Sequence, residues 1–185
     1  MELVFVAPEI PHNTGCAARL AAALGLRLHL VEPLGFSLED RYLKRAGLDY
    51  WPLVDLAVHP SLAALSESLS RGSSRPFDVR LRLFTARGGT SLFDVEFAPD
   101  DVLVFGSESR GLPPELLARH AERRVYVPIR PGVRSLNLAN VACLGVYTAT
   151  VRAGLPLPSN DGAYEPHPRA ADDVRPLSRV ARVDG

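Results

Sequence analysis

Short apolar runs alternate with amphipathic segments along most of the chain. The apolar runs are closed by Pro, Gly or polar residues and predict buried strands, at Leu3–Ala7, Leu28–Val31, Leu53–Val58, Leu81–Thr85, Val102–Phe105 and Val125–Val127. The segments between them have helical spacing and predict helices, at Cys16–Leu24, Ser37–Arg45, Ser61–Leu69, Pro113–Leu117 and Leu138–Arg152. This alternation indicates an α/β fold, a mostly parallel sheet with helices on both faces.

Polar residues mark the expected helix ends. Asn13 or Thr14 can cap the first helix, and Ser135 can cap the last one. Because a cap at Ser135 leaves no capping task for Asn137, that amide is available for another role. The polar stretch Gly72–Asp78 predicts a loop.

The last part of the chain differs in composition from the rest. Residues 155–185 contain five prolines, mixed charges and no clear periodicity, which is typical of a disordered or loosely attached segment. We therefore expect two parts, an α/β domain over residues 1–154 and a Pro-rich tail over residues 155–185.

Bulk composition excludes several classes of protein. The 21 cationic and 21 acidic side chains cancel, so any site for a nucleic acid must be a local patch. No apolar run approaches the ~20 residues that span a bilayer, and the first residues are too short and too acidic a stretch for a signal peptide. Cys16 and Cys143 lie in apolar helical patterns, which predict buried small side chains rather than a disulfide or a metal site. We expect a cytoplasmic protein without a membrane segment or a metal.

Three loops place polar side chains between a strand and a helix. Their sequences are PEIPHNTG at residues 8–15, FGSESRGLP at residues 105–113 and VPIRPGVRSLNLAN at residues 127–140. Loops that follow parallel strands meet at the carboxyl edge of the sheet, where open α/β sheets bind their ligands. Free N–H groups at helix N-termini and short polar side chains suit a polar small molecule. The sequence therefore predicts one composite site.

The second of these loops leaves more than one interpretation open. It is not a P-loop, because a Leu-Pro pair stands where the Lys-Ser/Thr pair is required. Ser109 stands in a near match to a nucleophile elbow, with His120 or His167 as its base, and this gives a serine hydrolase as one alternative. The other interpretation is that backbone amides and Glu108 hold a polar ligand.

Further motifs extend the pattern over most of the chain. Arg19 follows the first loop, RLHLVEPLGF occupies residues 27–36 and RAGLDYW occupies residues 45–51. Together with the three loops, these motifs resemble the SPOUT superfamily of knotted methyltransferases. Within it they are most similar to the tRNA (cytidine/uridine-2′-O)-methyltransferase family, which methylates the ribose 2′-hydroxyl of the wobble nucleotide. The chain departs from that family's pattern at Ala139, where serine is usual, and around Cys16.

The resemblance implies a fold, a cofactor and partners. The C-terminal segment would thread a loop to form a deep trefoil knot, and the protein would be a homodimer that binds tRNA across its two subunits. The cofactor would be S-adenosylmethionine, held among the three loops by Phe84, Thr85, Gly106, Glu108, Val127, Ile129, Ser135 and Leu136.

The resemblance also implies roles in catalysis. Arg19 would act on the ribose hydroxyl as a base or as an orienting group, and Asn13 and Asn137 would complete the catalytic group. The candidates for binding RNA phosphates are Arg110, Arg130 and Arg134. Tyr50 or Trp51 would either stack on an anticodon base or be buried in the core. A non-catalytic RNA-binding relative that keeps only the fold is the second alternative.

Overall fold

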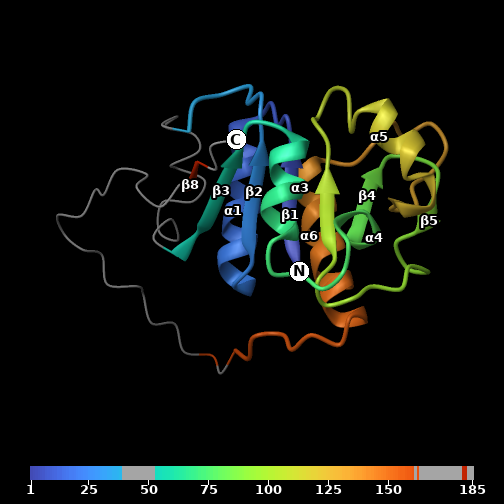
Figure 1. Cartoon of the computed structure of the whole chain (residues 1–185). Helices are drawn as coiled ribbons and strands as arrows, with labels where there is room; N and C mark the ends of the chain where they lie inside the picture. Colours follow the sequence, from blue (N-terminus) through green and yellow to red (C-terminus); the bar gives the residue numbers. More distant parts are fainter. Residues whose placement is uncertain (39–52, 161, 163–180, 183–185) are drawn as a thin grey trace.

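A single parallel sheet organises the molecule. The computed structural model describes residues 1–38, 53–160, 162 and 181–182. Within these ranges the strand order is β5-β7-β4-β6-β1-β2-β3-β8, and every neighbouring pair is parallel (Figure 1). The predicted α/β class is therefore confirmed. Some predictions lie outside the described residues, namely those for Tyr50, for Trp51, for His167 and for most of the helix expected at Ser37–Arg45.

The described elements follow the predicted order and add several short ones. The strands are β1 (Glu2–Val6), β2 (Arg27–Val31), β3 (Asp55–His59), β4 (Leu81–Thr85), β5 (Thr90–Ser91), β6 (Val102–Phe105), β7 (Arg124–Tyr126) and β8 (Ala181–Arg182). The helices are α1 (Pro11–Leu24), α3 (Leu62–Ser70), α4 (Phe77–Arg80), α5 (Pro114–Arg119), the 3-10 turn η2 (Ala121–Arg123) and α6 (Leu138–Arg152). The additions β5, β8 and α4 span two to four residues, too few to show a periodicity in the sequence. Within the described ranges, no helix is long and apolar enough to cross a bilayer.

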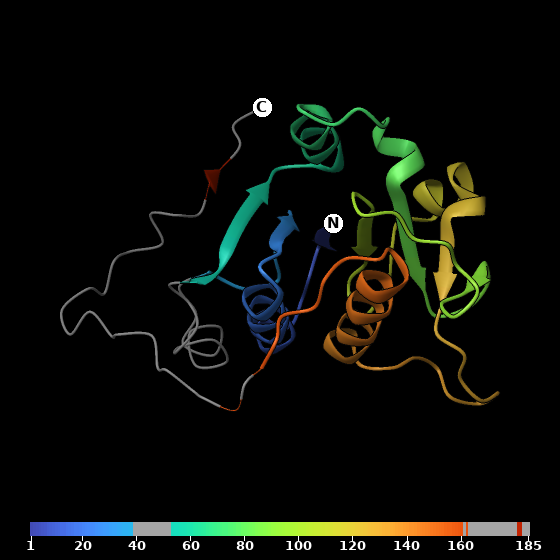
Figure 2. The same ribbon diagram turned by 90° about the horizontal axis from the view of Figure 1, so that it is seen from below.

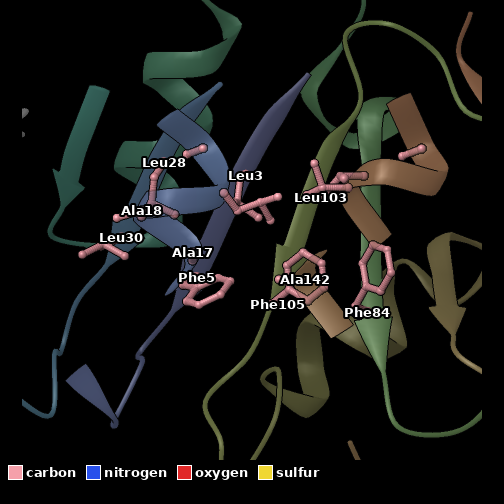
Figure 3. Packing of buried hydrophobic residues seen from close by; sticks show 14 of the residues in the cluster. Leu3, Phe5, Ala17, Ala18, Leu28, Leu30, Phe84, Leu103, Phe105 and Ala142 are labelled. Carbon is pink, nitrogen blue, oxygen red and sulfur yellow. The ribbon is translucent and has the colours of Figure 1, made fainter. Parts of the chain in front are cut away.

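Helices cover both faces of the sheet. Alternate residues of β1 contribute to two cores. Leu3 and Phe5 pack under α1 and α6 (Figure 3). Val4 and Val6 pack with residues of α3, α4 and α5. Figure 2 shows α1 and α6 together on one side of the sheet. Because successive side chains of a strand point to opposite faces, a strand buried on both faces is a continuous apolar run in the sequence.

Two helices are capped differently from the sequence prediction. α1 begins at Pro11, so Asn13 and Thr14 are buried inside the helix and do not cap it. The side chain of Asn137 accepts a hydrogen bond from the backbone N–H three residues later, so Asn137 and not Ser135 is the cap of α6. Both capping predictions were wrong, because several neighbouring polar residues satisfy the same capping rule and tertiary contacts select among them.

One side of α6 is apolar and open in the single chain. We call this the α6 apolar face; it consists of Cys143, Leu144, Tyr147 and Val151, all of which are exposed. The prediction that Cys143 is buried was therefore wrong, whereas Cys16 on α1 is partly buried. A helix that is apolar on more than one side does not reveal in its sequence which side packs on its own sheet.

A small part of the expected tail is described. It comprises residues 155–160, 162 and 181–182, and the last two form β8 beside β3. The boundary at residue 154 stays a prediction.

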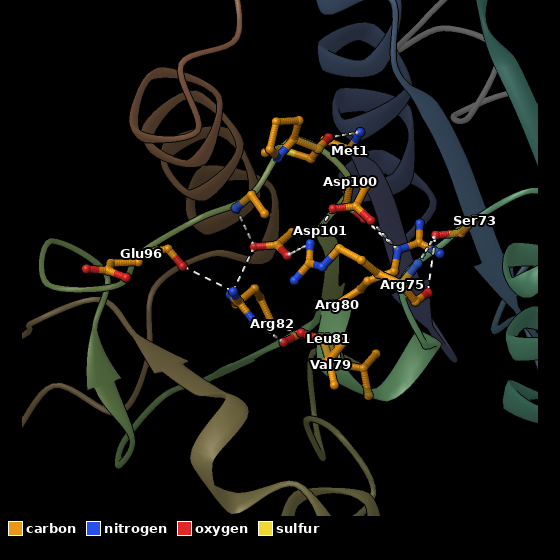
Figure 4. Close-up of polar contacts among 12 residues, drawn as sticks. Met1, Ser73, Arg75, Val79, Arg80, Leu81, Arg82, Glu96, Asp100 and Asp101 are labelled. Atoms are coloured by element: carbon orange, nitrogen blue, oxygen red, sulfur yellow. Dashed lines mark hydrogen bonds and ion pairs between the residues drawn. The ribbon is translucent and has the colours of Figure 1, made fainter.

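A charged cluster closes the amino-terminal edge of the sheet (Figure 4). The buried Asp101 carboxylate lies 3.0 Å from Arg82, and Arg75 pairs with both Asp100 and Asp101. Arg80 is also buried and donates to the Asp100 carbonyl at 2.8 Å. Burial lowers the pKa of Arg82 in spite of the neighbouring Asp101 carboxylate. These arginines hold the first residues of β4 and β6 together and therefore have a structural role.

A hydrogen-bonded chain of side chains crosses three neighbouring strands. Glu2 Oε2 lies 3.0 Å from His29 Nε2, and His29 Nδ1 lies 2.9 Å from His59 Nε2. His59 is fully buried. Burial, together with the nearby His29 and Arg27, lowers the pKa of His59 to about 4.

We expect the folded protein to lose stability as the pH falls from about 6.5 to about 4. In this window the unfolded chain binds a proton at His59 that the folded chain does not bind, so acid favours unfolding. The shift corresponds to at most about 3 kcal/mol of unfolding free energy, and His59→Gln should remove this part of the pH dependence. Urea unfolding of both proteins across the window measures it. Equal pH slopes for the two proteins would contradict the prediction.

Candidate functional site

The strand register brings the three loops to one edge of the sheet. Phe105 at the end of β6 pairs with Phe5 of β1 on one side and with Phe84 of β4 on the other. Thr85 of β4 in turn pairs with Tyr126, the last residue of β7. Because these strands are parallel, the loops that follow them all begin at the same carboxyl edge. This arrangement confirms that the loops share one edge, as the sequence predicted.

Glu108 ties the second loop to the start of α1. Its carboxylate accepts hydrogen bonds from the backbone N–H groups of Glu9 at 2.8 Å and Ile10 at 3.3 Å, and from the Asn13 amide at 2.8 Å. The residue at the N-cap of α1, Ile10, has no capping side chain of its own. A carboxylate at a helix N-terminus also interacts favourably with the helix dipole. Glu108 therefore caps α1 from a loop that is almost a hundred residues away in the sequence.

Two asparagines join α1 to the start of α6. Asn137 Nδ2 donates to Asn13 Oδ1 at 3.0 Å, while Asn137 Oδ1 accepts from the Asn140 N–H at 3.2 Å. Asn13 donates its own amide N–H to Glu108. Each amide therefore has a single orientation that satisfies all its partners. The chain Glu108–Asn13–Asn137 links all three loops by side-chain hydrogen bonds.

Ser109 makes a second set of contacts at the same edge. Its hydroxyl donates to Glu9 Oε1 at 2.6 Å, its N–H donates to Glu9 Oε2 at 3.0 Å, and its carbonyl accepts from Arg134 Nη2 at 3.0 Å. A serine nucleophile requires a histidine or similar base. Among the described histidines, His120 lies near Asp78 and His12 near Cys16, and neither is hydrogen-bonded to Ser109. The arrangement does not support a serine hydrolase.

Gly106 is required by the closure of its own loop. Ser107 and Gly111 exchange backbone hydrogen bonds at 3.2 and 2.9 Å. A Cβ at Gly106 would lie only 2.0 Å from the Gly111 carbonyl carbon and 2.2 Å from the Leu112 nitrogen. The absence of a side chain therefore lets the loop fold back on itself.

Phe84 and Thr85 have structural partners of their own. The Phe84 ring stacks on Phe105 with ring centroids 4.2 Å apart, and a Cβ at Gly145 of α6 would come within 2.8 Å of it. The Thr85 hydroxyl lies within donating distance of the Arg87 carbonyl at 2.8 Å and the Gly88 carbonyl at 3.0 Å. A ligand at this strand end would therefore meet backbone groups of Phe84 and Thr85 rather than their side chains.

Residues 1–147 match the model of the SpoU rRNA Methylase family. The chain belongs to this family. It is 45% identical to the tRNA (cytidine(34)-2′-O)-methyltransferase of Polaromonas sp. (strain JS666 / ATCC BAA-500), over 92% of this chain and 97% of the relative. It is 46% identical to the protein of the same name from Burkholderia ambifaria, over 82% of this chain and 95% of the relative. The resemblance drawn from the loop motifs is confirmed.

Several solved structures share the fold. A structure that gives insights into the 2-OH methylation of C/U34 on tRNA aligns with a TM-score of 0.75 and 50% identity, over 83% of this chain and 95% of that chain. The SpoU methyltransferase AviRb from Streptomyces viridochromogenes, in complex with the cofactor AdoMet, aligns with a TM-score of 0.68 and 24% identity, over 82% and 57% of the two chains. The second likeness concerns the fold alone.

Most of the remaining predicted site residues of this SpoU-family chain lie on exposed positions. Those on or beside the second and third loops are Arg110, Arg130, Ser135 and Leu136. Arg19 is exposed on α1, six residues or about 600° of helical rotation after Asn13. Its backbone position therefore lies about 120° around α1 from that of Asn13. Val127 and Ile129 are partly buried along the third loop.

Two residues at this edge were missed by the sequence interpretation. Glu9 is hydrogen-bonded to Ser109, and Arg87 Nη2 donates to the Val133 carbonyl of the third loop. Glu9 follows a predicted strand end, which is a signal that could have identified it. Arg87 follows the predicted strand Leu81–Thr85 at the same spacing, so the same signal could have identified it.

Proposed function

We propose that this protein transfers a methyl group from S-adenosylmethionine to the ribose 2′-hydroxyl of the tRNA wobble nucleotide, a cytidine or uridine at position 34. The SpoU-family relatives named above carry this activity in their names, at 45% and 46% identity. The observation that carries the proposal is the convergence of three polar loops at one edge, joined by the Glu108–Asn13–Asn137 chain.

The residues at the sheet edge fit a cofactor held by backbone groups. Thr85, Gly106 and Val127 end or follow the neighbouring strands β4, β6 and β7. Backbone groups beyond the end of a strand ladder lack strand partners and suit the polar edges of a nucleoside. When bound, S-adenosylmethionine supplies a methyl group on a positively charged sulfur. Ser135 and Leu136 on the third loop would complete its binding site, while Glu108 would shape that site by holding the loops.

The protein's own residues would align the ribose hydroxyl with the methyl group that is transferred. A ribose hydroxyl is a weak nucleophile near neutral pH, so the enzyme must place its oxygen in line with the reacting methyl and ease the loss of its proton. Arg19 would orient the hydroxyl and an adjacent phosphate through its several N–H donors. A guanidinium is a poor base near neutral pH, so orientation is the role we propose. Asn13 and Asn137 would keep α1 and the third loop in a fixed relation.

The proposed active form is a homodimer. Arg19 shares a stripe of α1 with His12 and Cys16, at spacings of four and three residues, and this stripe lies about 60–120° around the helix from Asn13. The α6 apolar face lies on the helix that packs beside α1. A second copy covering both helices would bury that face and bring Arg19 close to the loops of its partner. In this arrangement Arg19 would act on the loops of the partner subunit.

Local arginines would bind the RNA. Arg110 and Arg130 are exposed on the second and third loops, and the chain has no net charge that would attract RNA to its whole surface. Arginine binds phosphate with two parallel hydrogen bonds, which suits a patch that must position a backbone. We also propose a cytoplasmic location, where such an enzyme would meet its tRNA.

We further propose the C-terminal deep trefoil knot. The stretch between β4 and β6 contacts the last part of the domain at several points: Leu92 N donates to the Tyr126 carbonyl at 2.8 Å, and Arg152 Nε donates to the Val95 carbonyl at 2.9 Å. A Cβ at Gly89 would lie 2.3 Å from the Arg124 carbonyl oxygen. These contacts support a loop closed around the segment that leads into α6. Tracing the chain in an experimental structure tests the threading.

The proposed function is tested by transfer of a tritium-labelled methyl group from S-adenosylmethionine to tRNA. Nucleoside mass spectrometry should then locate a 2′-O-methyl group at position 34, and the same tRNA with a 2′-deoxy nucleotide there should accept no label. A non-catalytic RNA-binding relative would bind the tRNA without transferring label, and that outcome would refute the proposal.

A further inference from the structure

Ser109 is a point of contact for all three loops. Its hydroxyl and N–H donate to the two carboxylate oxygens of Glu9 in the first loop, at 2.6 and 3.0 Å. Its carbonyl accepts from Arg134 Nη2 in the third loop at 3.0 Å. Every polar group of Ser109 is thus used to join the loops, which leaves its hydroxyl no role as a nucleophile.

Each contact to Ser109 has one charged partner. One partner is a carboxylate that accepts two hydrogen bonds, and the other is a guanidinium that donates one. Hydrogen bonds with one charged partner are shorter and about twice as strong as bonds between neutral groups. Glu9 and Arg134 carry opposite charges and bind Ser109 from different loops, so the three residues together have no net charge.

The conformation of the third loop depends on hydrogen bonds to other segments. Residues 130–137 are exposed along most of their length, and Gly132 turns the chain with a φ of +90°. Within this segment, Arg134 donates to the second loop and Asn137 donates to α1. From outside it, Arg87 donates to the Val133 carbonyl. A loop with little buried surface opens locally unless such contacts hold it.

We propose that Glu9, Ser109 and Arg134 form a three-loop latch, a set of positioning residues that holds the third loop in the conformation that binds the cofactor. This inference rests on the proposed function, because it takes Ser135 and Leu136 in that loop as part of the cofactor site. The latch gives Arg134 a task within the protein, in place of a direct contact with an RNA phosphate. A pre-organised loop binds its ligand without first losing conformational entropy.

The latch predicts specific effects on cofactor affinity. Glu9→Gln, Ser109→Ala and Arg134→Ala should each weaken S-adenosylmethionine binding about tenfold in calorimetry, because each removes a hydrogen bond with a charged partner. Ser109→Thr keeps the hydroxyl and should bind the cofactor about as well as the parent protein. In the protein without cofactor, hydrogen exchange of residues 130–136 should rise in the three weakened variants, while exchange in β1 and β6 stays unchanged.

A double-mutant cycle separates a latch from independent contacts. Glu9 and Arg134 are joined through Ser109 in the structure, so the Glu9→Gln/Arg134→Ala protein should bind the cofactor about tenfold more weakly than the parent, not about a hundredfold. The matched control is an exposed ion pair at the C-terminal end of α3, in which Arg71 Nη2 lies 2.7 Å from Glu67 Oε1. Glu67→Gln and Arg71→Ala should leave both cofactor affinity and hydrogen exchange of the third loop unchanged.

Several results of these measurements would contradict the latch. The latch is overturned if the two effects multiply, if Ser109→Thr fails to restore affinity, or if the third loop exchanges at the parental rate in all variants. It is also overturned for Arg134 if Arg134→Ala leaves cofactor affinity intact and instead reduces the salt dependence of tRNA binding, which would indicate a phosphate contact. Failure of the parent protein to methylate tRNA would refute the proposed function, whereas the exchange measurement would still judge the latch.

Discussion

Arg19→Ala should reduce methyl transfer to tRNA by at least about 10²–10³-fold, the usual effect of removing a group that stabilises or orients the reacting atoms. Affinity for S-adenosylmethionine should stay at the parental value, because Arg19 lies on α1 away from the strand ends that would hold the cofactor. Single-turnover transfer of labelled methyl and calorimetry with the cofactor measure the two quantities separately. Arg71→Ala, at the residue that follows α3, is the matched control, since it also removes an exposed arginine.

The same variant tests where Arg19 acts. If the arginine serves the loops of the other subunit, a mixed dimer of Arg19→Ala with a cofactor-deficient variant should regain part of the activity of the parent dimer. The regain is expected because one site in the mixed dimer then has both an intact arginine and intact loops. Full activity of Arg19→Ala would remove this residue from the mechanism. Activity lost without any regain on mixing would place Arg19 in the site of its own chain.

Gly106→Ala should destabilise the protein by roughly 3 kcal/mol, the upper part of the range for overpacking, and should abolish cofactor binding. The added Cβ would lie within 2.4 Å of three backbone atoms of Gly111 and Leu112, and backbone cannot move aside as a flexible side chain can. Opening this loop would break the Ser107–Gly111 hydrogen bonds and displace Glu108 from the N-terminus of α1. Urea unfolding and cofactor calorimetry measure the two effects.

Gly72→Ala is the matched control for this prediction. Gly72 has a φ of +87° and no atom within 4 Å of an added Cβ, so only backbone strain opposes the substitution. We expect a cost of about 1 kcal/mol and unchanged cofactor affinity. A Gly106→Ala protein with parental stability and cofactor affinity would show that the second loop tolerates an open form.

The elements of the fold could be predicted where the chain is long and regular. Buried parallel strands such as β1 and β6 are continuous apolar runs because they contact helices on both faces. The helices α1 and α6 could be recognised by their spacing, but their first residues could not. Asn13, Asn137 and Ser135 all satisfy a local capping preference, and the choice was made by Glu108 and by the contact between the two asparagines.

The edge at which the three loops meet was also predictable, but the hydrogen bonds between the loops were not. Loops after parallel strands meet at one edge whatever their side chains are, so the sequence was sufficient to bring Asn13, Glu108 and Asn137 together. Which atoms pair depends on distances between residues about a hundred positions apart. For this reason Ser109 resembled a nucleophile in the sequence, although in the structure it joins Glu9 to Arg134.

The sequence by itself determined the α/β class, the family and the edge at which the three loops converge. These follow from periodicity and from motifs, which are properties of neighbouring residues. Only the tertiary structure decided that Asn137 caps α6, that Cys143 is exposed, and that Gly106 is needed for loop closure. Each of these depends on contacts between distant segments, and the free energy of such contacts is defined only when the chain has folded and brought both partners out of water.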